Sequence, residues 1–201
     1  MTVADTLTPG TPLQLDCRML PQHRGIGIPI RCGIAAACLC CILAAFACNP
    51  ARAAESDFLE RFRGDWSGSG KVQRDGGSQP RHVTCSIMGR PTDNRISAQG
   101  SCRAYLIFVR PVAIDVTYDP RSGTYRGTYT GARIGPARLS GTRSGDALNF
   151  RIEWPRPVNG DTQAAMVIQN DGRGILRITI LDNLTPGGPI LQTSEIILVR
   201  Q

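Results

Sequence analysis

The chain has 201 residues, of which 41% are hydrophobic and 19% charged, so it is long enough and apolar enough to bury a core. This composition excludes disordered and collagen-like proteins, and the formal net charge of +7 makes the chain basic. Glycine occurs 22 times while aromatic residues make up only 5%, a balance that favours many tight turns and an all-β fold.

The first element in chain order is an export signal. Two arginines, Arg24 and Arg31, precede an uncharged apolar run from Cys32 to Cys48, and Ala51-Arg52-Ala53 supplies small residues where a signal peptidase cleaves. We expect residues 1–53 to be a signal peptide that is cleaved after Ala53. Residues 54–201 then form a single β-barrel domain that is periplasmic or secreted.

Three alternatives to this leader stay open. The apolar run could be retained as a membrane anchor, although it is shorter than the ~20 residues that a spanning helix needs. Cys48 could carry a lipid, although Ala45-Phe46-Ala47 matches a lipobox poorly. Met19 is an alternative start that leaves a conventional basic leader, so the N-terminus given by the sequence could be over-long.

A short helix is predicted next, over residues 56–63. Ser56 is a good N-cap, and Phe58, Leu59 and Phe62 fall on one helical face. These apolar side chains predict that the helix acts as a lid on the domain that follows.

From Trp66 onward, apolar residues recur at every second position, which is the period of a β-strand with one buried face. Turn-forming sequences separate the strands at 119–123, 144–146 and 170–172, and loops are expected at 155–160 and 185–189. The bulky stretch 105–109 is expected to bend or end its strand at Pro111. The pattern predicts nine or ten strands.

These strands predict one antiparallel meander. No helical segment lies between them, so no crossover connection can make them parallel. A meander of this length either closes or leaves exposed edges. We therefore expect a closed barrel, with an open sandwich as the alternative.

The cysteines give a test of strand register. Six of the eight lie before residue 50, and only Cys85 and Cys102 remain in the mature chain. A two-residue hairpin loop at Asp93-Asn94 places these two opposite each other at a site without cross-strand hydrogen bonds, where Cα atoms are ~4.5 Å apart. In an oxidising compartment we expect a disulfide, and two free buried thiols are the alternative.

Catalytic and metal-binding patterns are not found in the mature sequence. It holds one histidine, His82, on the face opposite Cys85, and no serine lies in a nucleophile-elbow motif. Asp115 and Glu153 fall on outward-facing positions, so a paired-carboxylate mechanism has no support. We expect no enzyme activity, no metal and no cofactor.

The positive charge is carried almost wholly by arginine, with Lys71 the one lysine of the mature chain. Outward positions hold single, dispersed arginines, a distribution that does not predict a nucleic-acid site: Arg126, Arg138, Arg151 and Arg177. An anionic component of the cell envelope is the electrostatic partner that we expect.

Six aromatic residues project to the predicted interior: Trp66, Tyr118, Tyr125, Tyr129, Phe150 and Trp154. Two interpretations stay open, because these side chains either fill the core or line a cavity in which hydroxyl groups orient a small apolar ligand. Glycines on the same face favour some interior space: Gly68, Gly70, Gly100 and Gly127.

The segment Phe62 to Gly70, which contains Gly64-Asp65-Trp66 after a short helix, resembles the Gly-x-Trp start of lipocalin-like (calycin-type) barrels. It is also similar to the opening of nitrobindin-type haem barrels, but these need a late histidine ligand and none follows His82. A third resemblance is to small periplasmic metalloprotease inhibitors, which combine a lipocalin-like barrel with one disulfide in the early strands. Across its mature length the chain looks most like small exported bacterial proteins.

From the sequence we expect a non-enzymatic protein that binds a small apolar or amphipathic ligand in the periplasm. The alternative is an envelope interaction protein, or a protein similar to a protease inhibitor, that acts through its loops. The sequence does not predict an oligomeric state.

Overall fold

The structure is a computed structural model that describes residues 50–105 and 107–201. Most of the predicted signal peptide, residues 1–53, therefore lies outside the described residues. No helix in the described part of the chain is long and apolar enough to span a membrane.

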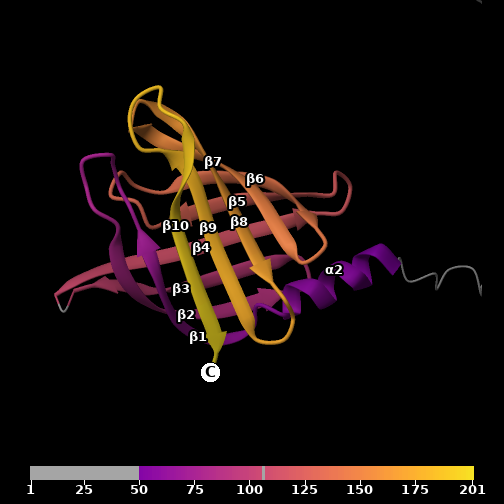
Figure 1. Ribbon diagram of the computed structural model, residues 1–201. Coiled ribbons are helices and arrows are strands. Elements are labelled where there is room, and N and C mark those ends of the chain that lie inside the picture. The colour runs from indigo at the N-terminus through magenta and orange to yellow at the C-terminus, as the bar shows by residue number, and fades with distance from the viewer. Residues whose placement is uncertain (1–49, 106) are drawn as a thin grey trace, which may run out of the picture. The chain divides into compact units, whose positions relative to one another are not determined.

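One helix and ten strands follow each other in chain order (Figure 1). Their bounds are α2 (Pro50–Glu60), β1 (Gly64–Val72), β2 (Arg81–Thr92), β3 (Arg95–Ala104), β4 (Phe108–Asp119), β5 (Thr124–Thr130), β6 (Ala137–Ser144), β7 (Ala147–Val158), β8 (Asp161–Asn170), β9 (Ile175–Asn183) and β10 (Ile190–Arg200).

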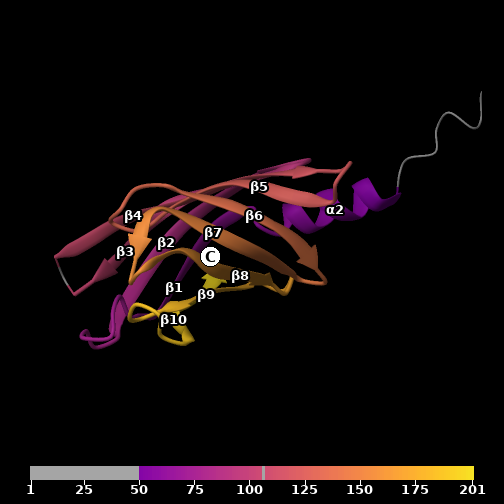
Figure 2. The ribbon, with the colours of Figure 1, turned by 90° about the horizontal axis from the view of Figure 1, so that it is seen from above.

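The strands form a closed antiparallel barrel. Each strand pairs with its neighbour in sequence, and β1 pairs with β10 to complete the ring. Helix α2 lies at one end of this ring in both views (Figures 1 and 2). The prediction of an all-β meander with one short N-terminal helix is confirmed, and the ring is closed as expected.

Inward-facing glycines allow neighbouring strands to approach closely. A Cβ atom on Gly68 would lie 2.0 Å from the carbonyl oxygen of Ile197 on β10, and one on Gly127 would lie 1.9 Å from that of Asp115 on β4. Both distances are far below any real contact, so only glycine fits there.

The α2 end of the barrel is filled. Phe58, Leu59 and Phe62 are buried beneath the helix with at most 5% of each residue exposed. The indole nitrogen of Trp66 donates a hydrogen bond to the Phe62 carbonyl (3.1 Å), and the fully buried Asn170 amide donates to the Arg61 carbonyl (3.0 Å). These contacts fix the helix across this end, which agrees with the predicted lid.

A buried carboxylate also ties α2 to the barrel wall. Glu55 accepts a hydrogen bond from the Tyr125 hydroxyl and forms an ion pair with Arg143, whose Nε lies 3.0 Å from Glu55 Oε2. The Arg143 guanidinium in turn lies 4.7 Å from the centre of the Phe58 ring.

The bounds of the helix differ from the prediction. We expected residues 56–63 with Ser56 as the N-cap, whereas α2 spans Pro50–Glu60 and Ser56 lies inside it. Alanine is the best helix former and proline is tolerated in the first turn, which explains the extension over 50–54. Three i to i+3 bonds then tighten the chain, and Gly64 follows with a φ of 107°.

Two expectations about strand ends were wrong, both at prolines. Pro111 does not end a strand but lies inside β4 opposite Ser101, because the chain turns earlier, between Ala104 and Phe108. Likewise β7 continues to Val158 through the segment predicted as a loop, with an irregular register after Glu153 that accommodates two prolines.

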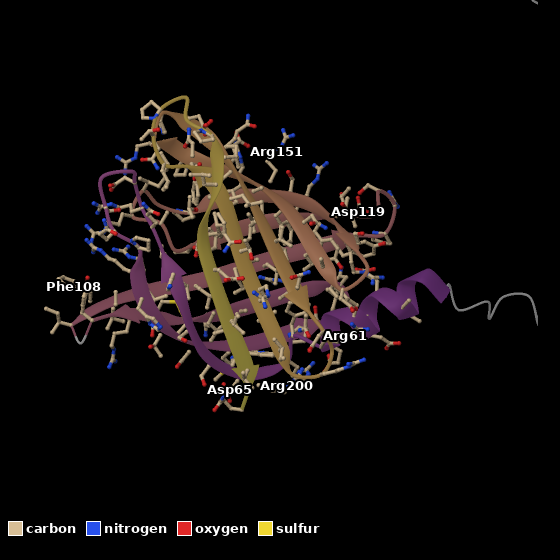
Figure 3. All side chains as sticks on the ribbon, viewed as in Figure 1. Arg61, Asp65, Phe108, Asp119, Arg151 and Arg200 are labelled. Carbon is tan, nitrogen blue, oxygen red and sulfur yellow. A yellow bond between two sulfur atoms is a disulfide. The ribbon has the colours of Figure 1, made fainter. Side chains whose placement is uncertain are left out.

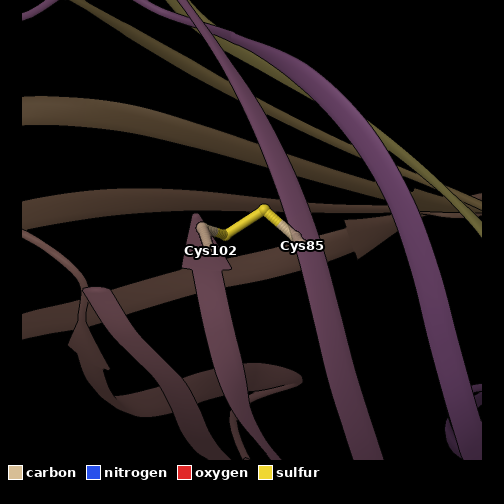
Figure 4. The surroundings of a disulfide bond; sticks show 2 residues. All are labelled: Cys85 and Cys102. Atoms are coloured by element: carbon tan, nitrogen blue, oxygen red, sulfur yellow. A yellow bond between two sulfur atoms is a disulfide. The ribbon is translucent and has the colours of Figure 1, made fainter. Parts of the chain in front are cut away.

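The predicted hairpin register of β2 and β3 is confirmed. Cys85 pairs with Cys102 and forms a disulfide with a Cα separation of 4.0 Å (Figure 4). Gly89 opposite Ala98 falls in the same register.

Candidate ligand cavity

The half of the barrel away from α2 contains a cavity of about 700 Å³. Five connections surround its mouth, those between β1 and β2, β3 and β4, β5 and β6, β7 and β8, and β9 and β10. Phe108 lies at this end, whereas Arg61 lies beside the helix at the other (Figure 3). The cavity therefore opens away from the filled end.

The walls of the cavity are mostly aliphatic, because alternation turns the β-branched and apolar residue of each strand inward. The lining includes Val83, Ile87, Ile96, Ile114, Met166, Ile178, Ile180 and Ile196. Phe62, which follows α2, and Leu148 also line it, so the cavity reaches toward the closed end.

The six aromatic residues predicted to line a ligand site divide between the two ends of the barrel. Tyr129 and Trp154 line the cavity, with ring centres 6.2 Å apart. The other four lie on the same inward face nearer α2, where they pack in the core: Trp66, Tyr118, Tyr125 and Phe150. A ligand contact for any of the six stays a prediction.

Arg110 is a cavity residue that sequence reasoning missed. It lies opposite Cys102, on the inward-facing series of β4 that continues with Val112 and Ile114, and its side chain is half-buried in the lining. Extending the period-two alternation backward through Pro111 would have found it.

Tyr129 lines the same cavity as this arginine. Burial raises the pKa of Tyr129 to about 12, and the positive charge of Arg110 acts in the opposite direction. The hydroxyl is therefore neutral near pH 7 and can donate a hydrogen bond. It also lies against Gly131, where a Cβ atom would be only 2.1 Å from the phenolic oxygen.

A buried carboxylate, Asp182, lies on the wall formed by β9. Its Oδ2 accepts a hydrogen bond from the indole nitrogen of Trp154 (3.2 Å), and its Oδ1 accepts one from the backbone N–H of Asn183 (2.8 Å). Burial raises the pKa of Asp182 above the ordinary value of 3.8, although these hydrogen bonds oppose the shift.

The rim of the mouth is basic. Arg74, Arg81 and Arg133 border the cavity with exposed side chains, and Arg74 pairs with Asp75 at 2.8 Å. Within the described ranges, none of the ion pairs involves Arg81, Arg110 or Arg133.

The hairpin between β3 and β4 gives the rim an apolar side. Four of its side chains are exposed, and we call them the apolar tip: Tyr105 (67%), Ile107 (77%), Phe108 (56%) and Val109 (53%). Three of them, all except Tyr105, also line the cavity mouth.

Among residues 50–105 and 107–201, no three His, Cys, Asp or Glu side chains are grouped closely enough to hold a metal ion. His82 is exposed, as alternation predicts. On the outer surface Asp115 accepts a hydrogen bond from Arg95 Nε (2.9 Å), while Glu153 pairs with Arg138 (2.6 Å).

A solved structure of the same fold is the crystal structure of Rv2717c from M. tuberculosis. It is 15% identical in sequence, with a TM-score of 0.57, and the match covers 72% of this chain and 96% of that chain. At this identity the similarity shows a shared barrel fold. No known protein family and no curated protein matches the sequence.

Proposed function

We propose that this domain is a non-enzymatic binding protein that holds a small apolar or amphipathic ligand inside its barrel. The observation that carries the proposal is the cavity of about 700 Å³, lined mainly by aliphatic side chains and open at one end. Ligand sites in proteins have volumes of roughly 300–1,000 Å³ and combine apolar walls with a few polar groups.

The place of action that we propose is the periplasm or the cell exterior. The Cys85–Cys102 disulfide supports an oxidising compartment, and the leader-like sequence before Ala54 supports export. The Gly-x-Trp segment at Trp66 and the closed barrel agree with a lipocalin-like protein, a class in which the barrel interior commonly holds a small molecule.

The experiment uses a neutral apolar dye, N-phenyl-1-naphthylamine, whose fluorescence increases in an apolar site. The domain should bind the dye at one saturable site. Ala98→Trp places a large side chain in the cavity, because Ala98 is an inward-facing lining residue of β3, and it should abolish binding. Gln99→Trp adds the same ring at the adjacent exposed position and is the control.

Native mass spectrometry of freshly purified protein gives a second readout. A bound small molecule should be detected in the wild-type and Gln99→Trp proteins and be absent from Ala98→Trp. The proposal fails if the folded wild-type domain neither binds the dye nor carries a small molecule.

A further inference from the structure

We propose that the ligand is an anionic amphiphile, an apolar chain that ends in a carboxylate or phosphate monoester. The head group binds Arg110 and the Tyr129 hydroxyl near the mouth, and the chain lies among the aliphatic walls. This inference rests on the proposed ligand-binding function and adds the charge of the ligand to it.

Arg110 is the first support, because it is a cation turned toward the cavity. It occupies an inward-facing position of β4 and is half-buried, yet it has no carboxylate partner among the described residues. A partly desolvated charge without a partner is unfavourable, so an anion that binds there gains more than it would in water. The guanidinium also offers paired N–H donors that match a carboxylate or phosphate.

Tyr129 supplies a second donor in the same region. Its hydroxyl donates no hydrogen bond to another described residue, and its ring is fixed against Trp154. Arg110 and Tyr129 line the same cavity, so both donors can reach one ligand. Two donors that line one cavity favour a ligand with an anionic oxygen atom.

The nearby carboxylates do not neutralise Arg110. Asp75 pairs with Arg74 at the rim, and Asp182 accepts hydrogen bonds from Trp154 and from the backbone of Asn183. Arg81 and Arg133 add positive charge where a ligand enters. A positive mouth above an apolar interior orders the ligand with its chain inside and its anionic group outward.

The test compares three probes with the same twelve-carbon chain, namely dodecanoate, dodecyl phosphate and dodecanol, by displacement of N-phenyl-1-naphthylamine. At least one anionic probe should bind at least about tenfold more tightly than dodecanol, because one charge-assisted hydrogen bond has an effect of this size. The comparison of the two anions identifies the head group. Arg110→Gln should remove the preference, so that neither anion binds more tightly than dodecanol, and Arg110→Lys should restore part of it.

Arg126→Gln is the matched control, because Arg126 is an exposed arginine on the outer face of β5. It should leave the binding of all three probes within about twofold of wild type. Equal binding of the three probes, or dye that none of them displaces, would overturn the anionic ligand and leave the proposed function standing. If the wild-type protein does not bind the dye, the proposed function itself fails.

A different observation, the apolar tip, carries a second inference. We infer that the apolar tip inserts into the surface of a bilayer that contains anionic lipid. Its four exposed side chains lie at the outermost part of one hairpin, and the Tyr105 and Phe108 rings are 6.3 Å apart. Exposed apolar groups of this kind mark interaction sites, and aromatic residues favour the membrane interface.

The positive charges beside the apolar tip favour a lipid surface that carries negative charge. Arg103 lies opposite Val109 with an exposed side chain, and Arg81 lies near the start of the neighbouring strand β2. Between residues 76 and 114 the one acidic residue is Asp93, which lies in the β2–β3 turn at the other end of the strands. The tip therefore combines apolar contact with unopposed positive charge.

Vesicle flotation tests this inference. The domain should float with vesicles of phosphatidylcholine and phosphatidylglycerol, less with phosphatidylcholine alone, and less at high salt. The double variant Ile107→Ser/Phe108→Ser should lose binding, while Ile175→Ser, at an exposed apolar site near the other end, should not. Circular dichroism and a cooperative urea transition show that each variant is folded. No flotation of the wild type, or equal loss in both variants, would overturn the inference.

Discussion

Tyr125 and Glu55 meet inside the filled end of the barrel, where the tyrosine hydroxyl donates a hydrogen bond to a carboxylate from α2. Both residues are at least nine-tenths buried, and Arg143 provides the balancing charge. This contact connects the helix to β5 across 70 positions of sequence.

We predict that Tyr125→Phe lowers the free energy of unfolding by about 1.5–3 kcal/mol, because the buried Glu55 carboxylate loses a donor. Urea denaturation of the mature domain measures this change. Tyr118→Phe is the control, because Tyr118 lies beside Tyr125 on β4 and its hydroxyl makes no hydrogen bond to a described residue. Equal losses in the two variants would contradict the assigned role of Glu55.

The predicted cleavage after Ala53 makes Glu55 the second residue of the mature chain. We expect a domain that begins at Ala54 to be more stable than one that begins at Ser56, by about the same amount as the Tyr125→Phe effect. In the shorter domain Tyr125→Phe should have little further effect, since the acceptor is gone. Urea midpoints of the four proteins measure this coupling, and additive losses would count against it.

The disulfide should contribute to stability. Replacing Cys85 and Cys102 together with alanine should lower the free energy of unfolding by roughly 3 kcal/mol, because the bond closes a loop with a sequence separation of 17. Reduction of the wild-type protein should give a similar loss in denaturant titration. An unchanged unfolding midpoint in both experiments would show that the bond does not stabilise the fold.

Gly127 tests the close approach of β4 and β5. Gly127→Ala should destabilise the domain by about 1–3 kcal/mol or more, since its Cβ would lie 1.9 Å from the Asp115 carbonyl oxygen. Gly77→Ala in the β1–β2 loop is the control, because its nearest atom would be 3.6 Å away. Thermal unfolding should place the two variants far apart, and similar transition temperatures would refute the tight pairing.

The raised pKa of Asp182 predicts how the stability of the domain depends on pH. Burial raises its pKa in the folded state, so the folded protein binds the proton more tightly than the unfolded chain does. As pH rises through the interval between the ordinary value of 3.8 and the raised value, this residue lowers stability. The stability of wild type relative to Asp182→Asn should therefore fall over that interval, as urea titrations at several pH values would show. If the stability of wild type relative to Asp182→Asn rises with pH, the pKa of Asp182 is not raised in the folded state.

Period-two alternation was enough to predict the closed meander and the partners Cys85 and Cys102, because strand register depends on local turn length and on which side chains share a face. Alternation does not report the height of a residue along the barrel axis. Tyr125 and Tyr129 point inward equally, yet only Tyr129 reaches the cavity. Height depends on the stagger of all ten strands and on the space that α2 fills, both of which are tertiary properties.

Arg110 was missed because proline was interpreted as the end of a strand. Pro111 was expected to end a strand, so the inward series of β4 was not extended to Arg110. Proline is tolerated where the sheet does not need its N–H, a condition that is known only once the pairing is known. The same reasoning explains why β7 was expected to end before Val158.

The position of α2 has a consequence for exchange kinetics. Because Phe58, Leu59 and Phe62 fill the end beneath α2, a second ligand cannot enter the cavity from that end while the proposed ligand is bound. The bound ligand must therefore dissociate through the mouth before another ligand can bind. The dissociation rate constant of the bound ligand should consequently not depend on the concentration of a competing ligand.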